Sequence, residues 1–310
     1  NNENRRLDKN LQGENGIMKI GIVGQGYVGT AVKEVFSKHY EVETYDLDKD
    51  KCSVDYLEDI VELSNIIFVC VPTPMKKDGS CDTSIVEGVI KDIDEAQQWC
   101  LDSMLNHGIA PVDDKYIIII KSTIPPGTTN KFNKKYKNVQ IVFNPEFLTE
   151  ANFIEDFKNQ DRIIVGGPRP ASTKVRQLFY KAFPKAHIIK TGSITAEMVK
   201  YVTNTFLATK VSFANEMKML CDELNIDYDK VVEYATYDER LGKSHWAVPG
   251  PDGKFGFGGS CFPKDINAFM AYAKQIGLNV NVASAAWKTN LEVRPEEDWK
   301  LLKGRAITDE

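Results

Sequence analysis

The 310-residue sequence predicts an α/β fold, in which a doubly wound parallel sheet is followed by a helical domain with a long central helix. Three observations lead to this prediction. A glycine-rich turn joins an apolar run to an amphipathic segment near the N-terminus, and apolar runs of strand length recur up to residue 190. A long stretch without proline or glycine comes next, which is typical of an extended helix.

The first predicted element is a strand–helix–strand unit between Met18 and Asp46. MKIGIVG has the composition of a buried strand, apolar residues recur at helical spacing from Val28 to Val35, and EVETYD forms the next strand. Segments that can hold helices separate the later strands, so that the whole region predicts one sheet domain. The later strands are expected at 65–71, 115–121, 139–143, 162–165 and 187–190.

The second region is predicted to be helical. The run from Thr195 to Glu223 contains no proline or glycine, and at 1.5 Å per residue it would form a helix roughly 40 Å long, suited to a spine or a dimer seam. Two further helices are predicted at DYDKVVEYATYD and PKDINAFMAYAKQIG. The expected organisation is a disordered tail at 1–16, a sheet domain at 17–191, a helical domain at 192–295 and a C-terminal tail at 296–310.

Composition excludes several classes of protein. The net charge of -5 and the lack of Lys/Arg-rich runs argue against a nucleic-acid partner. No apolar run has the length that a membrane span needs, and the first sixteen residues lack the apolar segment of a secretory signal. Six cysteines are scattered without a CxxC pair, which predicts reduced thiols, no metal site and a cytoplasmic location.

The glycine-rich turn predicts a dinucleotide site. Its GxGxxG pattern alone could mark only a tight connection, but here it follows a strand, opens a helix and precedes Asp46, which stands 20 residues after Gly26. A carboxylate there can bind both ribose hydroxyls and would repel a 2′-phosphate, so a Rossmann-type domain that binds NAD is predicted, although Lys51 lies nearby. The turn residues are Gly24, Gln25, Gly26, Tyr27, Val28 and Gly29.

Polar residues follow three of the predicted strands. Because ligands of open α/β sheets bind at the carboxyl ends of the strands, these residues are expected at the nicotinamide end of the site. Thr73 and Ser122 could equally be turn residues, whereas Glu146 and Glu150 are harder to explain in that way. The segments are Pro72-Thr73-Pro74, Lys121-Ser122-Thr123 and Asn144 to Glu150.

The stretch GFGGSCFPKD places a single cysteine before a predicted helix. Pro263 suits a first helical turn, so Cys261 should lie just before the helix N-terminus, where the thiolate form is favoured, and Lys264 adds positive charge. The glycines at 256, 258 and 259 are expected to leave room for a substrate beside the sulfur. The alternative is a buried structural cysteine.

A second constellation lies on the long helix. Lys200 and Asn204 are one turn apart, so they form either a solvated stripe or a pair of donors for an oxyanion. A hydride acceptor, a thiolate, an oxyanion-stabilising pair and spare carboxylates could together oxidise a primary alcohol to an acid through a thiohemiacetal and a thioester.

With these motifs, residues 17–295 resemble the nucleotide-sugar 6-dehydrogenase family, which comprises the UDP-glucose and GDP-mannose dehydrogenases. Members of the family usually continue into a second nucleotide-binding domain, so the resemblance implies a short form without it, a chain cut from a longer protein, or a chain whose partner supplies that domain. The similar segments are GQGYVG at 24–29, VPTP at 71–74, KST at 121–123, NPEFLTE at 144–150, DRIIVGG at 161–167, Lys200 with Asn204, DERLG at 238–242 and GFGGSCFPKD at 256–265.

The resemblance implies roles for individual residues. Cys261 would be the nucleophile, Lys200 and Asn204 would hold the oxyanion, and family members form dimers through the long helix. Water and protons would be handled by Glu150, Thr123 and Asp265; NAD would also contact Asp46, Lys51, Pro72, Thr73 and Lys264; the nucleotide sugar would contact Glu146, Phe147, Leu148, Phe255, Gly256, Gly258 and, from a neighbouring subunit, Arg240.

The resemblance favours UDP-glucose as the substrate and leaves two alternatives. A β-hydroxyacid dehydrogenase of the 6-phosphogluconate type also has a lysine and an asparagine one helical turn apart, but it removes one hydride and needs no thiol. A non-catalytic binder of NAD or of a nucleotide sugar is the second alternative.

Overall fold

The computed structural model describes residues 19–107 and 116–309, so the predicted tail at 1–16 lies outside the described residues. The chain forms two compact units. The described parts of 1–72 and 83–200 form the first, here called the sheet unit, and 73–82 with the described part of 201–310 form the second, the helical unit. Within the described ranges no helix combines the length and the apolar character that crossing a membrane requires.

The sheet unit contains a seven-stranded sheet of order β2-β1-β3-β4-β5-β6-β7. Every neighbouring pair is parallel except β5 and β6, which are antiparallel and meet at Phe143 and Gly166. The predicted doubly wound class is confirmed, but the prediction of a wholly parallel sheet is wrong at this pair. The connection 144–161 carries the helix α6, Phe153–Lys158, and it brings β6 back beside β5 in the opposite direction. The strands are β1 Lys19–Val23, β2 Glu41–Tyr45, β3 Ile66–Val69, β4 Tyr116–Ile120, β5 Val139–Phe143, β6 Arg162–Gly166 and β7 His187–Thr191.

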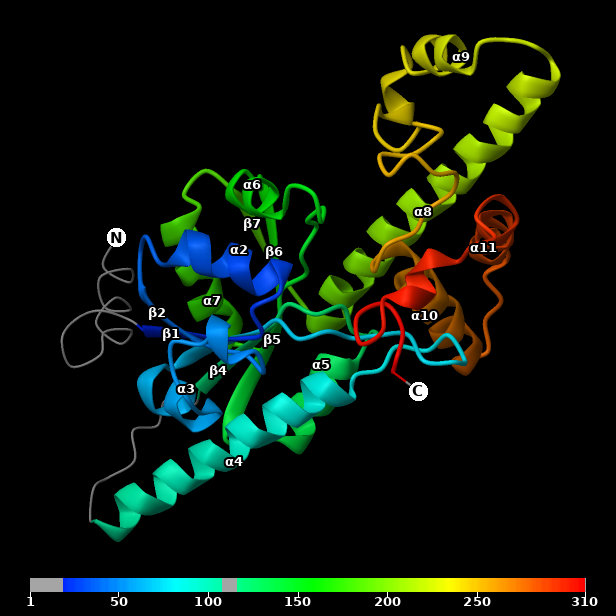
Figure 1. Ribbon diagram of the computed structural model, residues 1–310. Helices are drawn as coiled ribbons and strands as arrows, with labels where there is room; N and C mark the ends of the chain where they lie inside the picture. Colours follow the sequence, from blue (N-terminus) through cyan, green and yellow to red (C-terminus); the bar gives the residue numbers. More distant parts are fainter. Residues whose placement is uncertain (1–18, 108–115, 310) are drawn as a thin grey trace. The chain divides into compact units, whose positions relative to one another are not determined.

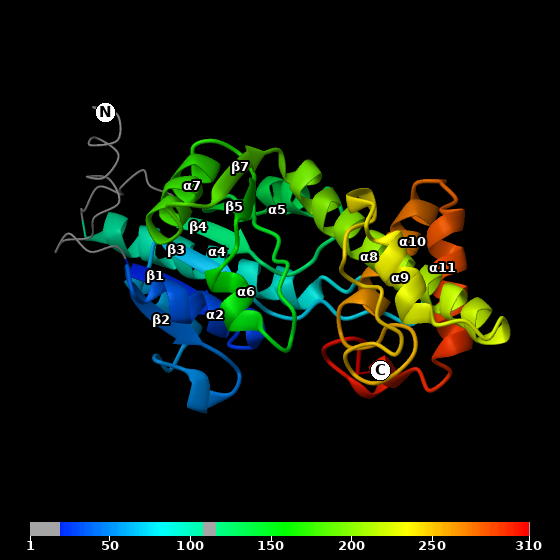
Figure 2. The ribbon, with the colours of Figure 1, turned by 90° about the horizontal axis from the view of Figure 1, so that it is seen from above.

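Helices cover both faces of this sheet (Figures 1 and 2). One face packs against α2, α6 and α7, and the other packs against α3, α4 and α5. Alternate residues of β4 supply both cores: Ile117 and Ile119 belong to the first, Ile118 and Ile120 to the second. The helices are α2 Tyr27–Phe36, α3 Leu57–Leu63, α4 Ser84–Asn106, α5 Thr128–Lys135, α6 Phe153–Lys158 and α7 Ala171–Ala182, with a 3-10 turn η2 at Lys49–Lys51.

The helical unit is built on the predicted long helix, α8, Ser193–Glu223, whose first residues up to Lys200 belong to the sheet unit. The predicted helices α9, Tyr228–Ala235, and α10, Phe262–Gln275, are present, and sequence reading missed α11, Asn281–Val293. Apolar residues of α8, α10 and α11 form one small core, which also includes Phe257. The 3-10 turns are η3 Glu239–Leu241 and η4 Asp298–Leu301.

The segment predicted to be a C-terminal tail is packed into the helical unit. Trp299 is fully buried, and its ring centroid lies 5.1 Å from that of Trp287. Ile307 forms β-bridges with Met75 and Lys303. An indole needs a large apolar site, and this one is provided by α11, which sequence reading did not predict.

Candidate active site

The glycine turn lies between β1 and α2, as predicted. Gly24 has φ +92°, and a Cβ there would lie 2.8 Å from the carbonyl oxygen of Cys70, while a Cβ on Gly29 would lie 1.8 Å from the Gly24 oxygen. These two glycines are therefore required by close backbone packing. Gly26 caps α2, and nothing lies within 4 Å of its Cβ position. Open space at a helix N-terminus suits an anionic group such as a pyrophosphate.

Asp46 stands beside this turn at the end of β2. One carboxylate oxygen accepts the Gln25 N–H at 2.6 Å and the other accepts the Asp48 N–H at 2.9 Å. A carboxylate offers about four acceptor positions, so two remain for the hydroxyls of a ribose. Lys51 pairs with Asp48 at 3.1 Å, and this hydrogen bond raises the pKa of Lys51. The residues present therefore fit the adenosine and pyrophosphate parts of NAD.

A buried lysine and an asparagine link the ends of β4 and β5 to the middle of β6 in the sheet unit. Lys121 follows β4, and its Nζ donates to Asn144 Oδ1 at 2.6 Å, while Asn144 Nδ2 donates to the Ile164 oxygen at 2.6 Å. Burial lowers the pKa of Lys121 to about 8, and the charge of Lys200 acts in the same direction. This network fixes the start of the NPEFLTE segment. Nearby, Ser122 Oγ donates to the oxygen of Val71, as a turn residue does.

Lys200 and Glu146 form a buried ion pair. Lys200 Nζ lies 3.2 Å from Glu146 Oε1 and donates to the Glu146 backbone oxygen at 2.6 Å, while Oε2 accepts the Leu148 N–H at 2.8 Å. Burial alone would raise the pKa of Glu146, but Lys200, the Leu148 N–H and Lys121 outweigh it and lower this pKa. Lys200 is thus held by a carboxylate, and both carboxylate oxygens of Glu146 are engaged.

The predicted thiol position is confirmed in the helical unit. Cys261 caps α10, Pro263 stands in the first turn, and the Cys261 Sγ lies 3.9 Å from Ser260 Oγ. The sulfur-bearing residue is partly exposed. A thiol at this position meets the positive end of the helix, which favours the thiolate.

Three polar side chains beside the thiol form one chain of contacts. Asn204 Nδ2 donates to Asp265 Oδ2 at 2.6 Å, and Lys264 Nζ donates to Asp265 Oδ1 at 2.5 Å. Burial would lower the pKa of Lys264, but Asp265 and the thiols of Cys261 and Cys81 outweigh it and raise this pKa well above its usual range. Lys264 is therefore a permanent positive charge that acts on the Cys261 sulfur.

Sequence reading expected Lys200 and Asn204 to point at one oxygen. The two residues lie one turn apart on α8, and each is bound to a carboxylate of its own unit, Glu146 for Lys200 and Asp265 for Asn204. The sequence predicted neither the pairing of Lys200 with Glu146 nor that of Asn204 with Asp265.

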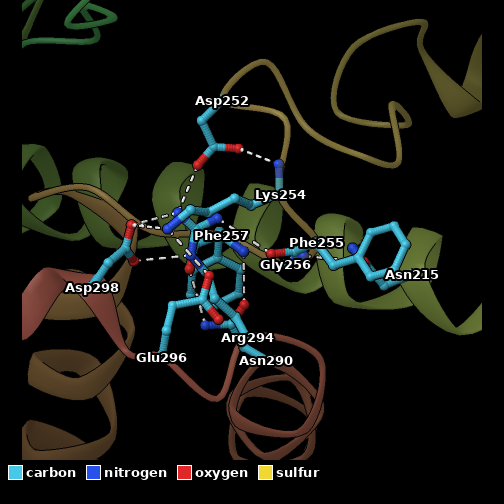
Figure 3. Close-up of polar contacts among 10 residues, drawn as sticks. All are labelled: Asn215, Asp252, Lys254, Phe255, Gly256, Phe257, Asn290, Arg294, Glu296 and Asp298. Carbon is cyan, nitrogen blue, oxygen red and sulfur yellow. Dashed lines mark hydrogen bonds and ion pairs between the residues drawn. The ribbon is translucent and has the colours of Figure 1, made fainter.

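The explanation offered for two of the glycines before the thiol is wrong. A Cβ on Gly256 would lie 2.4 Å from Asn290 Oδ1, and one on Gly258 would lie 2.4 Å from Arg294 Nη2. Their space is occupied by α11 and the residue that ends it, and is not open to a substrate. Figure 3 shows Gly256 together with Asn290 and Arg294. Gly259 differs, because nothing lies within 4 Å of its Cβ position and its φ is +70°.

The remaining predicted residues are placed as follows. Glu150 is exposed in the turn before α6, and Thr123 is buried. Burial raises the pKa of the Cys81 thiol to about 11, and a side-chain hydrogen bond with Thr73 acts in the opposite direction. The exposed Arg240 pairs with Asp238 on η3. Residues that sequence reading missed are Cys81, Asn215, Asn290 and Arg294. Among them, Arg294 has an aspartate four residues later, which could have signalled an ion pair.

A doubly wound sheet with a glycine turn at a helix N-terminus and a carboxylate at the end of the next strand is typical of a dinucleotide-binding domain, and here a helical unit follows it. Residues 52–184 match the NAD binding domain of the UDP-glucose/GDP-mannose dehydrogenase family, and residues 194–292 match the central domain of the same family. The chain belongs to this family and is an NAD-dependent oxidoreductase.

Individual relatives agree with this assignment. UDP-glucose 6-dehydrogenase TuaD of Bacillus subtilis is 31% identical, with 94% of this chain and 68% of the relative covered. The solved UDP-glucose dehydrogenase of Pyrobaculum islandicum is 26% identical, covers 89% of this chain and 68% of its own, and superposes with a TM-score of 0.76. A 3-hydroxyisobutyrate dehydrogenase of Mycobacterium tuberculosis is 16% identical with a TM-score of 0.69 over 91% and 95%, a likeness of fold alone.

Proposed function

We propose that this protein oxidises the primary alcohol of a nucleotide sugar to a carboxylate, with UDP-glucose as substrate and UDP-glucuronate as product. The observation that supports this most is the placement of Cys261 at the N-terminus of α10, next to the Lys264–Asp265–Asn204 chain. Relatives whose names carry UDP-glucose 6-dehydrogenase activity support the choice of sugar.

The turn at 24–29, Asp46 and Lys51 hold NAD in this proposal, with Pro72, Thr73 and Lys264 as further contacts. When bound, NAD accepts a hydride in each of the two oxidations. The chain must therefore supply only the groups that bind the sugar, hold the reacting carbon and move protons.

In the proposed reaction the thiolate of Cys261 adds to the aldehyde carbon, so that a carbon–sulfur bond forms and the carbonyl oxygen becomes an alkoxide. Lys200 and Asn204 stabilise this oxyanion. After the second oxidation the carbon–sulfur bond is a thioester, and water attacks it, releasing the acid and returning the thiolate. The carboxylates of Asp265 and Glu150 take up the protons that leave the alcohol and the water, and the Thr123 hydroxyl positions the water.

The stoichiometry of NADH tests the proposal directly. With UDP-glucose, GDP-mannose and UDP-N-acetyl sugars offered separately, two NADH per sugar are expected with UDP-glucose. One NADH per sugar would support a single-hydride dehydrogenase instead, and NAD binding without turnover of any sugar would support a non-catalytic binder.

Cys261→Ser tests the role of the thiol. Acid release is expected to fall at least about a hundredfold, because the nucleophile is lost, while the dissociation constant of NAD stays unchanged. Cys100→Ser on α4 is the matched control, since it removes a thiol of similar partial exposure from the sheet unit. Normal acid formation by Cys261→Ser would contradict the mechanism.

We further propose a cytoplasmic homodimer that forms through α8. All six cysteines are free thiols, as expected of a reducing compartment. The helix exposes large apolar side chains in its helical-unit part, which a second copy of the chain would cover. These are Val202, Phe206, Phe213, Met219 and Leu220, each at least 47% exposed.

A further inference from the structure

Residues 250–261, here called the thiol loop, are held by α11 from one side. Asn290, which is completely buried on α11, accepts the Phe257 N–H at 2.7 Å and donates to the Phe257 oxygen at 3.0 Å. From α8, Asn215 Oδ1 accepts the Gly256 N–H at 3.0 Å. Two side-chain amides thus fix the backbone in the middle of the loop (Figure 3).

The strongest connection is made by Arg294, which is 1% exposed and ends α11. Its Nε and Nη2 donate to the two carboxylate oxygens of Asp298, at 2.9 and 2.7 Å. Nη2 also donates to Asp252 at 2.6 Å, and Nη1 donates to the Phe255 oxygen at 3.2 Å. Four hydrogen bonds therefore use most of the five N–H donors of the guanidinium, and two of them reach the thiol loop (Figure 3).

The loop itself is shaped around this arginine. Asp252 bridges the guanidinium and the Lys254 N–H, which its other oxygen accepts at 3.1 Å. Lys254 Nζ lies 3.2 Å from Glu296 and 3.5 Å from Asp298, so the loop is tied on both sides to the segment after α11. Gly258 lies directly against the guanidinium, where no side chain fits.

Gly258, which packs against the Arg294 guanidinium, lies three residues before Cys261. Gly259 and Ser260 lie between them. Gly259 has positive φ and nothing within 4 Å of its Cβ position, and Ser260 Oγ accepts from Arg305 Nη2 at 3.5 Å. The ring of Phe262, the residue after Cys261, packs edge-on against Phe257 at 6.0 Å. The chain connection and this ring contact link the position of the thiol to residues 255–258, which are held by Arg294 together with Asn290 and Asn215.

We propose that Arg294, acting through Asp252 and Gly258, is a positioning residue that holds Cys261 at the N-terminus of α10. Weakening the hydrogen bond between Arg294 and Asp252 would let the thiol loop move, and the Cys261 sulfur would then leave its position at the N-terminus of α10. The proposal rests on the proposed function only in taking Cys261 as the reacting group.

The test variant is Asp252→Ala, because Asp252 is 48% exposed and its loss leaves the buried pair of Arg294 with Asp298 intact. Asp252→Asn keeps one acceptor oxygen and should give an intermediate result. Glu292→Ala is the matched control, since it removes a carboxylate from an exposed ion pair with Lys288 on α11. Arg294→Lys keeps the charge without the planar fork and is the stronger variant.

The first measurement is the rate at which iodoacetamide alkylates Cys261 at pH 7, followed by peptide mass spectrometry with the Cys100 peptide as internal reference. Asp252→Ala is expected to slow alkylation of Cys261 at least about threefold, whereas Glu292→Ala leaves it unchanged. With an active substrate, kcat should fall about tenfold while the KM for NAD stays within about twofold.

An unchanged or faster alkylation of Cys261 in Asp252→Ala, with the thermal unfolding midpoint retained, would overturn the proposal. If Arg294→Lys does not fold, the alkylation rate of Cys261 in Asp252→Ala still tests the proposal. If the unaltered protein turns over no nucleotide sugar, the proposed function fails, but the alkylation rates test the positioning role independently.

Discussion

Gly258→Ala should destabilise the protein through one steric conflict. The added Cβ would lie 2.4 Å from Arg294 Nη2, 2.6 Å from Arg294 Cζ and 2.7 Å from Asp298 Oδ1, whereas ordinary contact begins at 3.4 Å. The guanidinium would have to move by about 1 Å, which stretches its bonds of 2.6 Å to Asp252 and 2.7 Å to Asp298 beyond hydrogen-bonding distance.

The magnitude follows from the bonds that are lost. A hydrogen bond to a charged group contributes about 1.5–3 kcal/mol, and the carboxylates here are partly exposed, so two such bonds at the lower end give about 3 kcal/mol. Gly258 does not need positive φ, so the substitution adds no backbone strain. The entropy that alanine removes from the unfolded chain offsets only about 0.4–1 kcal/mol.

Urea unfolding followed by circular dichroism measures this loss, with Gly259→Ala as the matched control. Nothing lies within 4 Å of the Cβ position of Gly259, so its substitution carries only the strain of its φ of +70°, about 1–2 kcal/mol. If Gly258→Ala is as stable as the unaltered protein and changes only the KM for the sugar, the glycine serves substrate access and the steric argument is refuted.

Three further predictions concern the sheet unit and α8. Because the pKa of Lys121 is about 8 when folded and 10.5 when unfolded, its contribution to the free energy of unfolding rises between these pH values, by up to about 3 kcal/mol; denaturant titrations at several pH values should show this rise, and Lys121→Met should lack it. Glu146→Ala leaves the ammonium of Lys200 buried without its carboxylate, so urea unfolding should show a loss of about 3–5 kcal/mol, against no loss for the exposed Glu155→Ala. Phe206→Glu adds a charge to the apolar surface of α8 and should give a monomer by light scattering, while a protein that is monomeric without this change would refute the dimer.

Local patterns allowed much of the sheet unit and of the thiol site to be predicted. The turn from Gly24 to Gly29, Asp46 at the end of β2 and Cys261 at the cap of α10 each depend on neighbours within about twenty residues. Strand period, helix spacing and the preference of proline for a first turn are visible in such a window. The α/β class, the NAD-binding domain and the family are therefore confirmed.

Pairings between distant residues could not be predicted in this way. Lys200 meets Glu146 across 54 positions, and Arg294 meets Asp252 across 42. Neither partner has a local signal, because surface lysines, arginines and carboxylates look the same in a sequence as buried ones. The reversed direction of β6 likewise has no local signal, because the connection before it is as long as the one that joins the parallel strands β4 and β5.

The sequence by itself therefore determined the class of fold, the cofactor and the place of the thiol, because these follow from periodicity and from residues that few backbone positions tolerate. Only the tertiary structure showed that Asn290 and Arg294 leave no space for side chains at Gly256 and Gly258. It alone also showed which carboxylates bind Lys200 and Asn204. The reason is that burial and charge pairing are properties of three-dimensional neighbours, and packing brings these together from segments that share no local pattern.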